Sequence, residues 1–358
     1  FRFAVDYASA TNRSLVYAYS KLGRFAMLWL GVSFFVDIFI ATAAVSLVTA
    51  GLLISVFNLP FSDPQVGVAV AVFSAVVLLN GHYAKAERVV KILVTIFSVL
   101  TVITMVFALP ELGSGGRELF ADVVADRPTL VFVIAMTGWM PLPLTGAIYL
   151  SMWAREKKAA GGDTVSTRSA VHDLHVGWTL MVVLALCFVV MGAAVLFQTN
   201  RETPASATAF ANELMNLFTT VIGDWSYPLI AAAAIAVMWS SVFALMDAVP
   251  RVTTRLFDFV GKRDANATSR YTMFLGIQVV GVTIVMFWLL GSFGTFIDFA
   301  TSAGFIAAPA IAYYNYRAVT SAEVASSYTP TNTLLVWHWI GLSAMAAFAM
   351  AFLAERFT

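Results

Sequence analysis

The chain has 358 residues, of which 60% are hydrophobic and only 11% are charged, and its mean hydropathy is +0.84. A soluble domain of this length needs far more charge to cover its surface, so the composition predicts a protein that crosses a membrane repeatedly. The net charge of +1 by itself identifies no partner, and no nucleic-acid partner is expected. The single cysteine, Cys187, leaves no disulfide within one chain. The sequence contains neither a phosphate-binding glycine loop nor an HExxH zinc motif, so no enzymatic activity is expected.

Apolar runs of about twenty residues recur along the chain, and each suits the ~30 Å hydrocarbon core of a bilayer. We expect an all-α polytopic membrane protein with about nine spans. The eighth span follows the seventh after almost no loop, and an amphipathic helix at 211–223 is expected to lie beside the sixth. The predicted spans lie near 27–57, 65–82, 91–109, 129–153, 174–197, 226–248, 271–291, 293–314 and 333–353.

The basic residues predict the direction of these spans. Of the 21 lysines and arginines, all fall on one side of the predicted membrane except Arg117, Arg127, Arg201 and Arg356. Because basic loops stay in the cytoplasm, this asymmetry places the N-terminal stretch inside the cell and the C-terminus outside.

Three acidic residues lie within predicted spans, where charge is costly. Asp37 has no basic neighbour in sequence, which suits either a proton carrier or a neutral carboxyl hydrogen-bonded to another helix. Asp298 precedes two hydroxyl residues by one turn and serves either as a cation ligand or in helix packing. Asp247 has Arg251 four residues later, which predicts an ion pair at the membrane interface.

The fourth span, 129–153, carries helix-breaking residues in its middle, namely Gly138, Pro141 and Pro143. Proline cannot donate a backbone hydrogen bond, so Pro141 leaves the carbonyl of Thr137 without its helical partner. Bare carbonyls at this depth are tolerated only against protein or a water-lined cavity. A broken helix that lines a site explains this pattern, and a Pro-kinked structural helix is the alternative.

Met140 lies beside the freed carbonyl of Thr137 and offers a soft thioether sulfur. Together the oxygen and the sulfur form a small cation site, as in transporters whose broken helices bind substrate near the midplane. A thioether favours ions such as Mn²⁺ or Fe²⁺ over Ca²⁺ and Mg²⁺.

The stretch "TGWMPLP" resembles the sixth helix of the Nramp family of divalent-metal transporters, whose typical pattern is Ala-x-x-Met-Pro-His. Thr137 matches the alanine, Met140 the methionine and Pro141 the proline, while Leu142 stands where histidine is usual. The resemblance implies that the Thr137 carbonyl and the Met140 sulfur contact the metal.

The stretch "LWLGVSFFVDIFIATAAVSL" is similar to the third helix of the family, in which an Asp and a Glu serve proton movement. Asp37 matches the Asp and is thereby implied in the proton pathway, whereas Ile40 replaces the Glu. Asp298 falls in what would be the tenth helix and is implied in the metal path.

The resemblance implies a LeuT-type fold of two inverted five-helix repeats. The chain resembles the family from inside its second helix onward, so we expect it to lack the first helix and most of the second. The expected organisation is the end of the second helix and its loop at 1–25, one transmembrane transporter domain at 26–353, and a tail at 354–358.

The expected function is secondary transport of a divalent metal ion, Mn²⁺ or Fe²⁺, coupled to protons or to the membrane potential. The resemblance is to a divergent bacterial branch, so we expect a multi-pass protein of the bacterial inner membrane whose metal is cargo and which has no resident cofactor. Two alternatives stay open: a transporter of the same fold for an organic solute such as an amino acid or amine, and a non-transporting membrane sensor.

Overall fold

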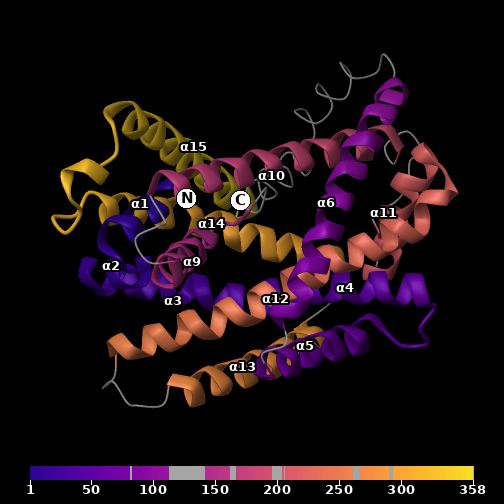
Figure 1. Cartoon of the computed structure of the whole chain (residues 1–358), viewed down its shortest axis with the longest axis horizontal. Helices are drawn as coiled ribbons and strands as arrows, with labels where there is room; N and C mark the ends of the chain where they lie inside the picture. Colours follow the sequence, from indigo (N-terminus) through magenta and orange to yellow (C-terminus); the bar gives the residue numbers. More distant parts are fainter. Residues whose placement is uncertain are drawn as a thin grey trace.

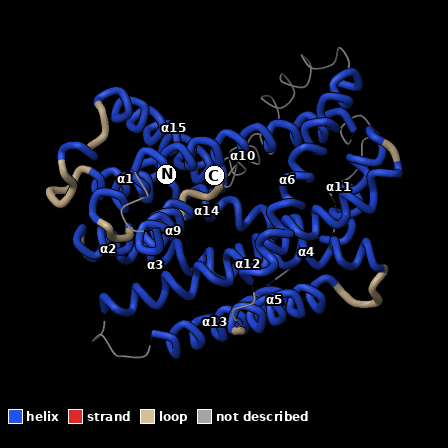
Figure 2. Tube along the Cα trace, viewed as in Figure 1, coloured by secondary structure: helices blue, strands red, loops and turns tan. Residues whose placement is uncertain are grey.

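The structure, a computed structural model, describes residues 1–80, 83–112, 142–161, 167–195, 204, 206–260, 267–289 and 293–357. Every regular element in these ranges is a helix (Figure 2). The α-helices are α1 (Arg2–Thr11), α2 (Leu15–Leu22), α3 (Arg24–Val36), α4 (Thr42–Phe57), α5 (Asp63–Leu79), α6 (Tyr83–Ala108), α9 (Gly146–Gly161), α10 (Thr167–Val195), α11 (Ala207–Ile222), α12 (Tyr227–Val260), α13 (Ala267–Ile284), α14 (Phe293–Val319) and α15 (Asn332–Phe357).

Among the described residues, six helical stretches are long and apolar enough to cross a membrane. They coincide with the first, third, fifth, sixth, seventh and ninth predicted spans. The second predicted span corresponds to the shorter α5, and the eighth to α14. Most of the fourth lies outside the described residues, so the count of nine stays a prediction. The six are Arg24–Phe57, Val90–Ala108, Arg168–Val195, Asp224–Leu256, Thr268–Trp288 and Asn332–Ala354.

The first of these stretches is not a uniform α-helix. Between α3 and α4 the chain widens into a π-helical segment, η1 (Asp37–Ala41). A second π-helical segment, η6 (Val285–Leu289), ends α13. The two neighbouring helices approach closely at Phe39 of η1, whose ring occupies the space where a Cβ on Gly281 would lie. Neither π-helical segment was predicted from the sequence.

One end of the bundle lies on the left in Figure 1, and we call it the basic end because α2 and α14 both end there with a basic residue, Lys21 or Arg317, in the last turn. This basic end holds α2, the C-terminal end of α12, the start of α13, and the connection between α14 and α15 (Figure 1). The connection between α4 and α5 lies at the opposite end, together with α11 (Figure 1). A buried apolar cluster fills each end: one packs α1, α2 and α9 against α12, and the other packs α6, α10 and α11 against α12.

Two local expectations need correction. The amphipathic helix begins at Ala207 rather than at 211, and it packs more extensively against α4 than against α12. The reason is Gly51 of α4, whose missing side chain lets the backbone of α11 come into contact. The stretch after α1, predicted to be a loop, contains the buried helix α2.

Candidate functional site

The residues expected to bind the metal lie largely beyond what the structure describes. Thr137, Gly138, Met140 and Pro141 fall outside the described residues, so their roles stay predictions. Asp298 is described only as a position in the first two turns of α14.

The C-terminal side of the predicted break is described. Leu142 and Pro143 have no regular structure, and α9 begins only at Gly146. The side chain of Leu142 folds back over this glycine, because a Cβ there would lie 2.8 Å from Leu142 Cδ2. An apolar contact thus occupies the position at which the family pattern usually has a histidine.

The first turn of α9 satisfies its own backbone donors. The N–H groups of Gly146, Ala147 and Ile148 each donate to the carbonyl three residues earlier, at 2.9, 3.0 and 3.0 Å. The last of these carbonyls belongs to Thr145, whose buried hydroxyl has no hydrogen-bond partner among the described residues. Because these N–H groups are engaged, the start of α9 offers little to an anion.

Asp37 is the first residue of the π-helical segment η1. A π-helix pairs residues five apart, which places Asp37 in register with Thr42. The Thr42 hydroxyl accepts a hydrogen bond from Gln278 Nε2 of α13 at 3.0 Å, and the same nitrogen lies 3.4 Å from the carbonyl oxygen of Leu245 in α12. Thr42 and Gln278 are fully buried, so this three-helix contact is a polar node in an apolar bundle.

Asp247 behaves as its spacing predicted. Its carboxylate accepts a hydrogen bond from Arg251 Nε at 2.8 Å and one from the Tyr271 hydroxyl at 3.0 Å. The ion pair is confirmed. The contact with Tyr271 of α13 could not be predicted from the spacing along one helix.

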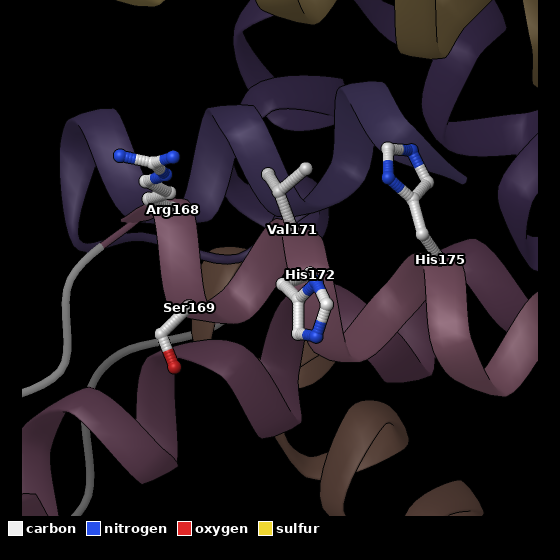
Figure 3. Close-up of a pocket in the computed structure, with 5 residues that line it drawn as sticks. All are labelled: Arg168, Ser169, Val171, His172 and His175. Carbon is white, nitrogen blue, oxygen red and sulfur yellow. The ribbon is translucent and has the colours of Figure 1, made fainter.

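A surface pocket near the start of α10 is lined by five residues, Arg168, Ser169, Val171, His172 and His175. In Figure 3, Arg168, Val171 and His175 extend to one side of the helix, while Ser169 and His172 extend to the other. The two imidazoles therefore do not converge on one ion, and the guanidinium disfavours a cation. Within the described ranges, no group of three or more His, Cys, Asp or Glu side chains is arranged to hold a metal.

Comparison with known proteins identifies the family. The model of the family described as natural resistance-associated macrophage protein-like, Nramp, matches residues 4–355. An uncharacterized protein of Pasteurella multocida (strain Pm70) is 27% identical over 364 residues, covering 99% of this chain and 82% of that protein. Crystal structures of two mutants of the Eremococcus coleocola manganese transporter match with a TM-score of 0.63 and 14% identity, covering 98% of this chain and 76% of theirs. Because the family model spans nearly the whole chain, the protein belongs to the Nramp family.

Proposed function

We propose that this protein is a secondary transporter that moves divalent metal ions, Mn²⁺ or Fe²⁺, across the bacterial inner membrane. The observation that carries the proposal is the family match over residues 4–355, joined to the fold shared with a manganese transporter. Membership of the family makes the chain a multi-pass membrane transporter of metal ions rather than an enzyme. The choice of ion, the site and the coupling are the parts that need experiment.

The proposed metal site lies at the break before α9. The carbonyl oxygen of Thr137 and the sulfur of Met140 contact the ion, and Asp298 of α14 contributes along the path. Gly138 and Pro141 release the backbone from helical geometry. A thioether among oxygen ligands favours Mn²⁺ and Fe²⁺ over Ca²⁺ and Mg²⁺, which supports a transition metal as cargo.

The first turn of α9 argues against an amino acid as the alternative cargo. In LeuT-type transporters a half-helix N-terminus with free N–H groups holds the substrate carboxylate. Here the N–H groups of Gly146, Ala147 and Ile148 are bonded to carbonyls of the same segment. This arrangement supports a cation over a carboxylate. It does not separate a metal from an organic amine, so uptake measurements must include one.

For the coupling, we propose that Asp37 carries a proton, with the membrane potential as the other driving force. The π-helical segment that begins at Asp37 supports a functional role, because such segments occur frequently at functional sites. Ile40 and Leu142 replace a Glu and a His of the family pattern, so a proton has fewer titratable groups to use here.

Uptake of Mn²⁺ into proteoliposomes tests the site. Met140→Ala should reduce uptake at limiting Mn²⁺ by roughly tenfold or more, since even the loss of a residue that only supports a metal ligand costs about 10–100-fold. Met350→Ala is the matched control, because Met350 is 66% exposed on α15. Uptake that is equal in the two variants would remove the thioether from the proposal.

The same vesicles test the coupling. An inward proton gradient should stimulate uptake by the unaltered protein, and Asp37→Asn should abolish the stimulation while uptake driven by the potential persists. Stimulation that survives Asp37→Asn would assign the proton to another group. Absence of uptake for Mn²⁺, Fe²⁺ and every other divalent ion would contradict metal transport. Uptake of an amine would then favour a transporter of an organic solute. If no solute is taken up at all, the result would favour a non-transporting sensor.

A further inference from the structure

The short helix α2 lies buried at the basic end of the bundle. Four of its eight residues are at most 4% exposed: Leu15, Val16, Ala18 and Tyr19. This i, i+1, i+3, i+4 spacing places them on one side of the helix. They pack into the apolar cluster that also includes residues of α1, α9, α12 and α14. Connections between membrane helices ordinarily run over the surface, so a connection this deeply buried calls for an explanation.

One end of α2 is attached to α9. The backbone N–H of Leu15 donates to the hydroxyl of Ser151 at 3.0 Å, and that hydroxyl donates to the carbonyl of Ile148 at 2.7 Å. Ser151 is fully buried. Through this contact α2 holds the helix that directly follows the predicted break.

The middle of α2 is attached to α14. The Tyr19 hydroxyl lies 2.9 Å from Asn315 Oδ1 and 3.2 Å from the carbonyl oxygen of Ile311. One hydroxyl proton can serve only one acceptor at a time, and the shorter contact is the one to Asn315. The Tyr19 ring also packs on Tyr314, with ring centroids 5.5 Å apart. α2 thereby joins α9 to α14, the helix that carries Asp298.

We propose that α2 is the inner gate of this transporter, and that the hydrogen bond from Tyr19 to Asn315 is the latch that keeps it closed. The proposal rests on the transport function proposed above. α9 and α14 cannot move apart at the basic end unless the contact with Ser151 or the contact with Asn315 breaks. In this structure both are intact, so the basic end is closed.

The hydrogen bond from Tyr19 to Asn315 stabilises the closed state only weakly. Asn315 is 2% exposed, and its Nδ2 has no acceptor among the described residues. A buried amide group left without an acceptor offsets part of what the Tyr19 bond contributes. The closed state is therefore favoured only modestly, as alternating access requires, because a gate must open at each cycle.

Cysteine labelling in inside-out membrane vesicles tests the latch. With Cys187→Ala as background, Ala147→Cys places one thiol at the start of α9, where the side chain is fully buried in the closed state. Tyr19→Phe removes only the hydroxyl, and it should speed labelling by N-ethylmaleimide about 2- to 10-fold, as expected for the loss of one net hydrogen bond. Tyr17→Phe is the control, since it makes the same change on a half-exposed residue of the same helix.

A second variant distinguishes a latch from general loosening. Asn315→Leu should also speed labelling, and combining it with Tyr19→Phe should add less than the sum of the two effects, because both remove one contact. Unchanged labelling in Tyr19→Phe, an equal increase in Tyr17→Phe, or fully additive effects would overturn the proposal.

Labelling needs no metal, so metal uptake and labelling can fail independently. Faster labelling without Mn²⁺ uptake would support the gate and reject metal as cargo. All variants should elute as the unaltered protein does in size-exclusion chromatography.

Discussion

Gly51 of α4 is the residue at which a single methyl group should most disturb this fold. A Cβ there would lie 2.8 Å from the backbone nitrogen of Thr208 and closer still to the carbonyl group of Ala207. These are backbone atoms of α11, so no change of rotamer relieves the contact. Restoring an ordinary separation of about 3.4 Å requires α11 to move by more than ~0.6 Å, because the Ala207 carbonyl is nearer than the Thr208 nitrogen. We expect Gly51→Ala to destabilise the protein by about 1–3 kcal/mol, the usual cost of overpacking.

The displacement also strains the hydrogen bonds that anchor α11. The Asp63 carboxylate accepts from the N–H groups of Ala207 and Thr208 at 2.9 and 3.3 Å, and from the Thr208 hydroxyl. A thermal unfolding scan in detergent should show a lower midpoint for Gly51→Ala, by roughly 1–4 °C. The control is Gly276→Ala on α13, where a Cβ would meet no heavy atom within 4 Å. There the better helix propensity of alanine should leave the midpoint unchanged or higher. A midpoint for Gly51→Ala that is no lower than that of Gly276→Ala would refute the close backbone approach.

Two further changes probe polar contacts. Asp63→Asn replaces a charged acceptor by a neutral one, which should weaken the anchoring of α11 by about 1–2 kcal/mol; faster amide hydrogen exchange in the first turn of α11 is the measurement, and unchanged exchange there would contradict it. Gln278→Leu leaves the buried Thr42 hydroxyl and the Leu245 carbonyl without their donor, so the unfolding midpoint should fall, for a cost of about 1–3 kcal/mol. Adding Thr42→Val should recover part of the lost stability, since it removes the hydroxyl left without a donor. A further drop in the unfolding midpoint would contradict the proposed contact of Gln278 with Thr42 and Leu245.

Hydropathy predicted the helices well because a membrane span must be both long and apolar, and this property belongs to the segment alone. The stretch from Arg24 to Phe57 and the one from Asn332 to Ala354 needed no partner to be recognised. The ion pair of Asp247 with Arg251 was predictable for the same reason, since a spacing of four residues along one helix brings the two side chains close together.

Features that depend on two helices at once were not predictable in this way. The stretch "DIFIA" of η1 is unremarkable as a helix, and its widening coincides with Phe39 packing on Gly281, 242 residues further along the chain. The burial of α2 did leave a signal, because Leu15, Val16, Ala18 and Tyr19 follow helical spacing in a stretch read as a loop. Its partner Asn315 gave no sequence signal of this contact, since an asparagine near a helix end is common. The metal site near the breakers Pro141 and Pro143 stays a prediction from the sequence, whereas the packing of Leu142 over Gly146 is visible only in the fold.

The two ends of the bundle are fastened by different chemistry. At the end opposite the basic loops, a carboxylate, Asp63, holds the start of α11 through several hydrogen bonds. At the basic end, the neutral Tyr19 and Asn315 hold α2 to α14, with one amide hydrogen-bond donor left unsatisfied. The ion pair of Arg13 with Glu323 at 3.5 Å also lies there, but both side chains are exposed, so it adds at most about 1 kcal/mol. Hydrogen bonds to a charged group contribute about 1.5–3 kcal/mol each, against about 0.5–1.5 kcal/mol for a neutral pair. The basic end is therefore the weaker of the two, and we expect it to open first when metal occupies the site. Hydrogen exchange with and without Mn²⁺ should show this as faster exchange in α2 while α11 stays protected. Exchange that rises in α11 alone would show that the opposite end opens first.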